Sequence, residues 1–286
     1  MLRILGVFAH PADMVTECGG TLARHADAGD EVVSVIITHG GRIHPTIYVE
    51  DQRRDPSSTG AATRDDIIAR KHAEVERAAS ILGLERVVYL DHEDSMISVD
   101  DEIVQEVADV IAEVCPQVVV THHPGFSPAY GNDHCIAGQI AVAASGLAHQ
   151  RFEALDGGAA AHFVKQTYFI SVGVSSRSTT IPGGGPVNDV YIDISSVVER
   201  KIRAMDEFVS QGYDGDFARK CVAGHNGHWG SMAGVPYAEA FMRGAVETFD
   251  LLPVAEQILK RDEHTMHRDY SRVTNPWSVP AKEQDE

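Results

Sequence analysis

The 286-residue chain lacks the features typical of secreted, membrane and nucleic-acid-binding proteins. Its four cysteines are widely spaced and include no CxxC pair, which predicts reduced thiols rather than disulfides. Basic residues are few, with 24 Lys and Arg against 42 Asp and Glu, and a formal charge of −18 disfavours binding to a phosphate backbone. No secretory signal is visible, and no apolar run approaches the roughly 20 residues of a membrane span. We therefore expect a cytoplasmic protein with neither nucleic-acid nor membrane partners.

The glycine pattern of a dinucleotide-binding turn is also missing. Such a turn needs G-x-G-x-x-G between the first strand and its helix, whereas this chain offers only Gly19-Gly20 after a ten-residue loop. That loop instead carries His10, Asp13 and Glu17. Dinucleotide binding is therefore disfavoured, and the loop indicates a different chemistry.

Apolar, β-branched runs alternate with helical patterns along most of the chain. This alternation predicts an α/β fold: a Rossmann-like, doubly wound, mainly parallel sheet with helices on both faces and a C-terminal strand-helix extension. The expected strands are residues 2–9, 31–38, 86–90, 117–121, 166–172 and 189–194. The expected helices are residues 20–28, 64–82, 102–114, one beginning near Ile136, and one opened by a capping box from Ser196 to Glu199.

We expect one catalytic domain over residues 1–252, followed by a polar C-terminal tail or arm over residues 253–286. Residues 39–65 are too many for an ordinary βα loop of about 2 to 6 residues, so they predict a lid, a binding loop or a disordered excursion. Residues 224–230 hold two histidines in a glycine-rich stretch, which is expected to be a loop at the pocket, a subunit contact or a simple turn.

Three side chains suggest a metal site. His10 and Asp13 follow the first strand, and His134 lies in another strand-to-helix loop. Open α/β sheets bind ligands at the carboxyl edge of their strands, so a His, Asp, His set with an open fourth position is possible there, as in catalytic zinc sites. The alternative is that His10 caps a strand end, Asp13 caps the next helix, and His134 is a surface or core histidine.

The loop resembles the signature of the PIG-L/LmbE superfamily of zinc-dependent N-deacetylases, A-H-P-D-D followed after five residues by G-G-T-L-A. Here it reads Ala9-His10-Pro11-Ala12-Asp13, then Gly19-Gly20-Thr21-Leu22-Ala23. Further similar segments are residues 74–83, 90–94, 121–122, 133–134 and 237–241, so the resemblance covers about the first 245 residues. It implies that His10, Asp13 and His134 are zinc ligands.

Ala12 departs from that signature. In the deacetylases the first Asp of the pair acts as general base, and a methyl group cannot accept a proton. A subgroup that resembles the 4-oxalomesaconate (4-carboxy-2-hydroxymuconate) hydratases of aromatic-acid catabolism carries H-S-A-D there and adds water to a conjugated diacid. This chain is similar in its Ala-Asp pair and in the spacing from Tyr130 to Asp133-His134. It lacks the histidine that those hydratases have near residues 168–173.

Further residues are candidates for roles around the metal. Tyr130 resembles the tyrosine that polarises the substrate oxygen, although it could equally pack under the loop. Asp133 would orient an imidazole or act as a base, and His122 should face the pocket while His123 turns back into the sheet. Asp94 resembles a substrate-contacting acid or belongs to a solvated turn. Possible replacement bases are Glu50, His44 and Glu17, and possible clamps for substrate carboxylates, unless they only solvate the loop, are Arg42, Arg53, Arg54 and Arg64.

Three functions fit these features. The first is a zinc-dependent hydratase or related lyase acting on a small unsaturated carboxylic acid, because it tolerates Ala12 and uses the arginines. The second is a zinc-dependent N-deacetylase or amidohydrolase acting on an N-acyl sugar or related amide. The third is a metal-binding protein that has lost catalysis. All three require Zn²⁺, and the enzymes would act on a small molecule, which the arginines predict to be anionic. We also expect a homo-oligomer, with the tail as an arm on a neighbouring copy.

Overall fold

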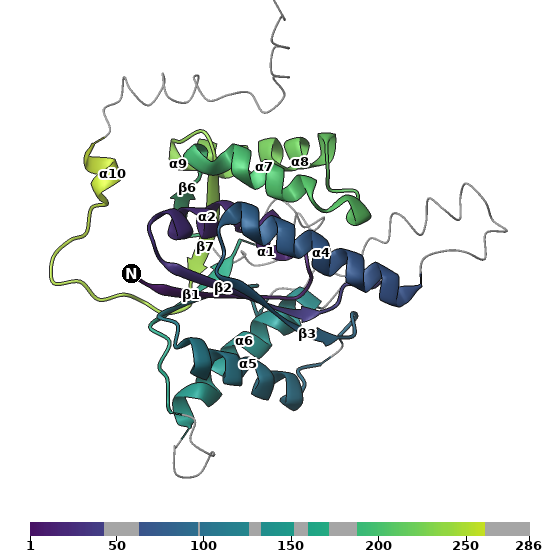
Figure 1. Cartoon of the computed structure of the whole chain (residues 1–286). Helices are drawn as coiled ribbons and strands as arrows, with labels where there is room; N and C mark the ends of the chain where they lie inside the picture. Colours follow the sequence, from purple (N-terminus) through teal and green to yellow (C-terminus); the bar gives the residue numbers. More distant parts are fainter. Residues whose placement is uncertain (43–62, 97, 126–132, 152–159, 172–187, 261–286) are drawn as a thin grey trace, which may run out of the picture.

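The fold is centred on one seven-stranded sheet. The computed structural model describes residues 1–42, 63–96, 98–125, 133–151, 160–171 and 188–260 (Figure 1). The strand order is β3-β2-β1-β4-β5-β7-β6, in which β1 to β5 are parallel and β7 runs antiparallel to both of its neighbours. The strands are β1 (Arg3–Phe8), β2 (Glu31–Thr38), β3 (Arg86–His92), β4 (Val118–Thr121), β5 (Gln166–Ile170), β6 (Val190–Asp193) and β7 (Ala238–Arg243).

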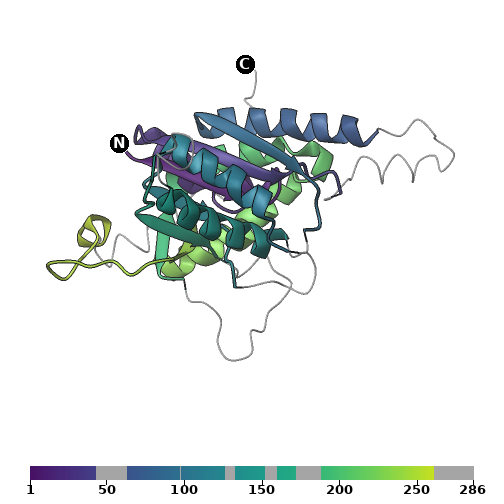
Figure 2. The ribbon, with the colours of Figure 1, turned by 90° about the horizontal axis from the view of Figure 1, so that it is seen from below.

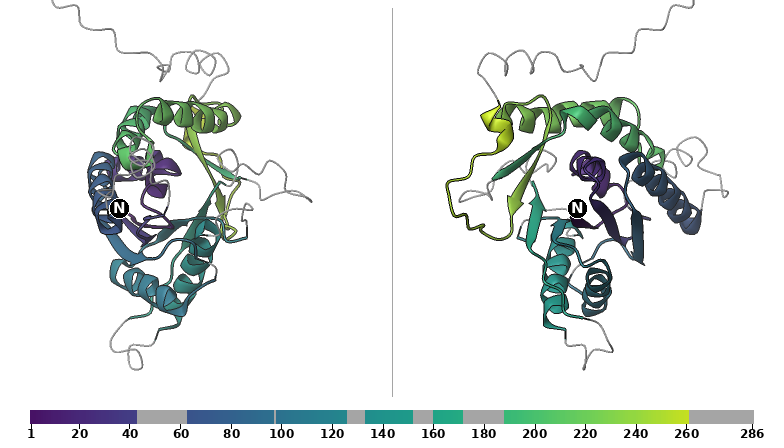
Figure 3. Two further views of the ribbon diagram at one scale, coloured as in Figure 1. Left: turned by 90° about the vertical axis from the view of Figure 1, so that its right-hand side faces the viewer. Right: turned by 60° about the vertical axis from the view of Figure 1, so that its left-hand side comes forward.

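Helices cover both faces of this sheet, which confirms the predicted doubly wound α/β fold (Figures 1 and 3). Helices α5 (Asp101–Val114) and α6 (Asp133–Gln150) pack side by side on one face and lie in front of the strands when the molecule is seen from below (Figure 2). The other face carries α1 (Asp13–Thr16), α2 (Gly19–Asp27), α4 (Arg64–Leu82) and α7 (Val198–Asp206). Two apolar clusters fill the space between sheet and helices, one on each face. Because β1 and β2 are buried on both faces, their sequences are nearly all apolar.

The C-terminal half differs most from expectation. The predicted capping box at Ser196 is wrong: Ser195–Val197 form a 3₁₀ turn, and α7 starts after Val197 without a side-chain cap. The glycine-rich stretch is helical rather than a loop, because a π-helical turn (Val222–Asn226) joins α8 (Asp216–Cys221) directly to α9 (Gly227–Ala233). Helix α6 starts three residues before Ile136, and β7 was not foreseen as a strand. The remaining elements are a 3₁₀ turn, Val209–Gln211, and the exposed α10, Glu256–Leu259.

The topology fixes where a ligand should bind. From β1 the chain proceeds through β2 to β3 on one side, whereas β4 and β5 lie on the other side of β1. The loops after β1 and β4 therefore diverge at the carboxyl edge, and such a switch point forms a crevice. His10 follows β1 and His122 follows β4 at this point.

Among the described residues, no helix combines the length and the apolar character needed to cross a bilayer. All four cysteines are free, and Cys18 and Cys135 are buried, as expected for small apolar side chains.

Candidate metal centre

The three predicted ligands meet at the switch point. His10 lies two residues after β1, Asp13 is the first residue of α1, and His134 lies in the first turn of α6. Helix α6 can approach this closely because Gly138 packs against the main chain that follows β4. A Cβ on Gly138 would lie only 2.2 Å from the His122 carbonyl oxygen. Packing of α6 against the sheet edge thus brings together residues that are more than 100 positions apart in the sequence.

The donor atoms are spaced as a tetrahedral ion requires. His10 Nδ1 lies 3.2 Å from His134 Nε2 and 3.3 Å from Asp13 Oδ2, and the third side of the triangle, His134 Nε2 to Asp13 Oδ2, is 3.4 Å. With zinc bonds of about 2.0 to 2.1 Å, neighbouring ligands on a tetrahedron lie about 3.3 to 3.4 Å apart. Two imidazole nitrogens and one carboxylate oxygen are also a donor set that zinc accepts. We call these three residues the metal triad; they fit zinc in both spacing and chemistry.

Charges within the metal triad are strongly coupled. Burial alone would lower the pKa of His10, but the carboxylates of Asp13 and Asp133 raise it to about 9. Burial would likewise raise the pKa of Asp13, but the imidazoles of His134 and His10 hold it well below its ordinary value. Without an ion, the cluster therefore keeps a proton on an imidazole to balance the Asp13 carboxylate. A divalent cation would supply that positive charge instead.

Asp133 orients the His10 imidazole rather than that of its chain neighbour, His134. Its Oδ2 lies 2.9 Å from Nε2 of His10 and also accepts a hydrogen bond from the main-chain N–H of Ser95. This contact places a proton on Nε2 of His10. The lone pair of Nδ1, which faces Asp13 and His134, is then available to a metal ion. Sequence reasoning favoured orientation by Asp133, and the structure places it on His10 rather than on His134.

His122 faces the metal triad, as alternation along β4 predicted. Its Nε2 lies 3.2 Å from Asp13 Oδ2 and accepts a hydrogen bond from the Ala9 main-chain N–H at 3.3 Å. Its ring is stacked on that of His134, with centroids 4.3 Å apart. Burial, together with the nearby His134, lowers the pKa of His122 to about 4, so this imidazole is neutral. A neutral ring whose Nε2 accepts from Ala9 has no proton facing Asp13, so His122 supports the centre by stacking on His134.

Ala12 presents no functional group to the centre. Its side chain is only 2% exposed and belongs to the apolar cluster on the α2 side of the sheet. Position 12 is the N-cap of α1 and makes no side-chain hydrogen bond. Position 12 therefore supplies the centre with no proton acceptor.

Arg42 and Asp94 meet at the start of the long loop that follows β2. Asp94 is buried, and its two oxygens accept the main-chain N–H groups of Gly40 and Arg42, so it shapes the start of the long loop. The Arg42 guanidinium is exposed and lies 3.7 Å from Glu93, which also pairs with Arg64. Both of these guanidinium groups are thus near enough to one another to share a carboxylate.

Lys71 is a buried cation that the sequence analysis did not single out. Its ammonium donates to the Gly40 carbonyl, and burial lowers its pKa to about 8. A lysine within a charged helical pattern gives no sequence signal for such a position, because only packing of α4 against the sheet edge buries it.

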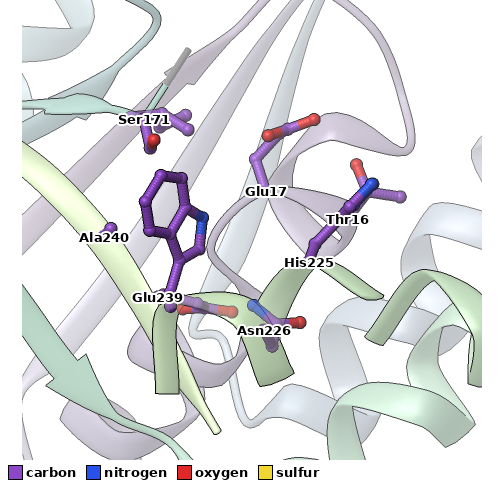
Figure 4. A pocket seen from close by; sticks show the side chains of 9 residues that line it. Thr16, Glu17, Ser171, His225, Asn226, Glu239 and Ala240 are labelled. Carbon is purple, nitrogen blue, oxygen red and sulfur yellow. The ribbon is translucent and has the colours of Figure 1, made fainter. Parts of the chain in front are cut away.

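A small cavity lies at the C-terminal end of α1. Its volume is about 20 Å³, and its walls come from the end of α1, the ends of β5 and β7, and the π-helical turn (Figure 4). Glu17, one helical turn after Asp13, lines it together with His225 and Trp229. Burial raises the pKa of Glu17 to about 7.

A buried ion pair holds this wall in place. The Glu239 carboxylate accepts the N–H groups of Gly20 and Thr21 at the start of α2 and pairs with Lys201 Nζ at 2.7 Å. Lys201 also donates to the Thr16 carbonyl, which ends α1. The double glycine of the loop motif has a steric reason as well, since a Cβ on Gly20 would lie 2.7 Å from Ile194 Cγ2.

Several predicted site residues lie outside the described residues. These are Tyr130, Glu50, His44, Arg53 and Arg54. Their roles stay predictions.

The chain is similar to several known proteins. A model of the PIG-L family, GlcNAc-PI de-N-acetylase, matches residues 5–145, which include the whole metal triad. The diacetylchitobiose deacetylase of Thermococcus kodakarensis is 26% identical over 212 residues, covering 73% of this chain and 70% of the relative. The 4-oxalmesaconate hydratase of Pseudomonas putida is 29% identical over 137 residues, covering 48% of this chain and 49% of the relative. The crystal structure of 4-carboxy-2-hydroxymuconate hydratase from Pseudomonas putida has a TM-score of 0.70 at 23% identity, covering 88% of this chain and 100% of that one.

Proposed function

Because this chain belongs to the PIG-L superfamily, we propose that it is a zinc-dependent hydratase that adds water to a small unsaturated carboxylic acid, in aromatic-acid catabolism. The observation that carries this proposal is the buried methyl group of Ala12, where the deacetylase signature has its base. Hydration of a conjugated acid has no amine leaving group to protonate, so it makes fewer demands on that position than amide hydrolysis does. The similarity to a hydratase supports the same proposal.

In this proposal His10, Asp13 and His134 hold the ion. Zinc would supply Lewis acidity toward a substrate oxygen and acidify a water molecule. Asp133 keeps His10 in the tautomer whose Nδ1 is free, and His122 steadies His134 by stacking. Arg42, Arg53 and Arg54 would bind the substrate carboxylates, and the exposed guanidinium of Arg42 supports this role for it. Of the proposed proton acceptors, Glu17 lies within the described residues, one turn from Asp13.

The second candidate is a zinc-dependent N-deacetylase acting on an N-acyl sugar or related amide. It is favoured by the longer match to the diacetylchitobiose deacetylase. The two functions differ in their products: hydration yields one product with the mass of substrate plus water, whereas deacetylation yields two.

The metal assignment is tested by zinc content. We expect about one zinc per chain in the purified protein and loss of the metal in His134→Ala, because the two remaining ligands bind an ion weakly. The matched control is His149→Ala, an exposed histidine in the last turn of the same helix. Full zinc content in His134→Ala would contradict the assignment.

The reaction is tested with zinc-loaded wild type and Ala12→Asp, each offered an unsaturated dicarboxylic acid and an N-acetylated amino sugar. We expect the wild type to hydrate the acid and to leave the amide intact, and Ala12→Asp to lose hydration or gain weak amide cleavage. Efficient amide cleavage by the wild type would place the deacetylase first. Metal binding without turnover of either class would favour the non-catalytic alternative.

We further propose a cytoplasmic homo-oligomer. The four free thiols support a reducing compartment. Between residues 246 and 259, exposed apolar side chains lie on a segment that leaves the body of the molecule (Figures 1 and 3): Val246, Phe249, Leu251, Leu252, Val254, Ile258 and Leu259. Light scattering on the full chain and on a chain ending at residue 244 tests whether this arm joins copies.

A further inference from the structure

The cavity lined by Glu17 lies near the metal triad, and of its lining residues the proposed function uses Glu17 alone. Glu17 follows Asp13 by one helical turn, and its main-chain N–H donates to the Asp13 carbonyl at 3.0 Å. The Glu17 carboxyl is also close enough to His134 and Asp13 for their charges to affect its pKa, so the cavity that it lines is near the metal triad. At about 20 Å³ the cavity has room for one water-sized group rather than a whole molecule.

The polar groups of the cavity favour a group that both donates and accepts a hydrogen bond. Glu17 supplies an oxygen acceptor in either protonation state. His225 is a candidate for the complementary donor, because its Nδ1 lies 3.3 Å from the Cys221 thiol and its Nε2 is the other ring nitrogen. A thiol that donates to Nδ1 leaves the ring proton on Nε2. Burial and the nearby Lys201 lower the pKa of His225, which keeps the ring neutral.

The charges around the cavity disfavour an anionic group. Neither arginine nor lysine lines it within the part of the chain that the structure describes, whereas two glutamates do. Lys201 lies behind the wall, is fully buried, and is paired with Glu239. A carboxylate entering the cavity would lose its hydration without a cation beside it.

One wall is aromatic and held in place. Trp229 lines the cavity and makes edge contacts with Tyr191 and His228, at centroid distances of 6.2 and 4.7 Å. An indole face suits C–H groups. The π-helical turn creates this arrangement, since it places His225 and Asn226 in the cavity wall just before Trp229 (Figure 4).

We propose that this cavity is a substrate subsite that accepts a hydroxyl-bearing carbon and excludes a carboxylate. The inference deepens the proposed function, on which it rests: the substrate would present its carboxylates toward the arginines and an uncharged hydroxyl group toward Glu17 and His225. The sequence alone is compatible with a pocket wall, a subunit contact or a turn at residues 224–230.

Binding of small probes tests the subsite without turnover. Trp277→Phe leaves Trp229 as the sole tryptophan, so its fluorescence reports on the cavity. The probes are propane-1,2-diol and lactate, which share a carbon skeleton and differ by CH₂OH against carboxylate. Each is titrated into zinc-loaded protein and into chelator-treated protein, where lactate cannot coordinate an ion.

We expect a saturable fluorescence change with the diol in both forms and none with lactate in the metal-free form. Glu17→Ala should weaken the diol by roughly five- to tenfold, the value of about one hydrogen bond. Glu17→Gln, which keeps an oxygen acceptor at this position, should bind the diol within about twofold of the wild type. The matched control is Glu113→Gln, an exposed glutamate on α5.

Equal responses to both probes in metal-free wild type, or no response to the diol, would overturn the subsite. The absence of hydration by zinc-loaded wild type in the separate product assay would overturn the proposed function instead. The two failures are distinguishable because the titration involves no reaction.

Discussion

Replacing Lys201 by Met should destabilise the protein by about 3 to 5 kcal/mol. Lys201 is fully buried, and Glu239 is only 1% exposed. Breaking a buried pair by removing one partner leaves an uncompensated charge, and measured costs of this kind are about 3 to 5 kcal/mol. The two N–H groups at the start of α2 still contact Glu239 but cannot replace a cation.

The double variant separates charge from packing. In Lys201→Met/Glu239→Gln no buried charge remains, and the amide oxygen can still accept from Gly20 and Thr21. Replacing a whole buried pair is often close to neutral. We therefore expect the double variant to be more stable than Lys201→Met alone, which a double-mutant cycle reports as a coupling energy between the two residues.

Urea unfolding in the presence of a chelator measures both effects without a contribution from metal binding. With a slope of about 3 kcal/mol/M, the midpoint of Lys201→Met should fall by roughly 1 to 1.7 M. Lys220→Met, at an exposed site on α8, is the control and should change the free energy of unfolding by less than about 0.5 kcal/mol. A midpoint for Lys201→Met equal to that of the control, or a double variant no more stable than Lys201→Met, would refute the reasoning.

Three further outcomes are expected at the metal centre. Because the metal-free pKa of His10 is about 9, zinc binding below that pH displaces a proton. The apparent zinc affinity, measured with an indicator dye, should therefore fall roughly tenfold for each unit of pH between pH 8 and pH 6. A constant affinity would contradict this. Asp133→Asn should weaken zinc binding by about 10- to 100-fold, while Asp101→Asn at the exposed start of α5 leaves it unchanged. Gly138→Ala should cost about 1 to 3 kcal/mol in unfolding experiments and weaken zinc binding, because its methyl group would displace α6 from His122. Gly146→Ala on the same helix, with open space at its Cβ, should be neutral or stabilising, and equal losses in the two variants would rule out the steric explanation.

Local patterns determined the parallel half of the fold. The apolar, β-branched residues 31–38 form a strand buried on both faces, and the periodic residues 64–82 form a helix with a capping box at Thr63 and a left-handed Gly83 at its end. These elements depend on neighbouring residues along the chain, which is why the sequence was enough. The grouping of His10, Asp13 and His134 was expected from the resemblance of their motifs to a known family, and the fold brings the three side chains together, while their role as metal ligands stays a prediction.

Tertiary structure decided what depends on contacts between distant segments. Asp133 orients His10 rather than its neighbour because α6 enters beside β1, and this choice is invisible in the dipeptide Asp133-His134. The π-helical turn and the burial of Lys201 arise where α7, α8 and β7 pack on α1, and residues 224–230 show only glycines and histidines that favour a loop. Helix propensity is a weak guide where packing supplies the free energy of helix formation. The cavity wall formed by the π-helical turn could therefore be found only in the folded chain.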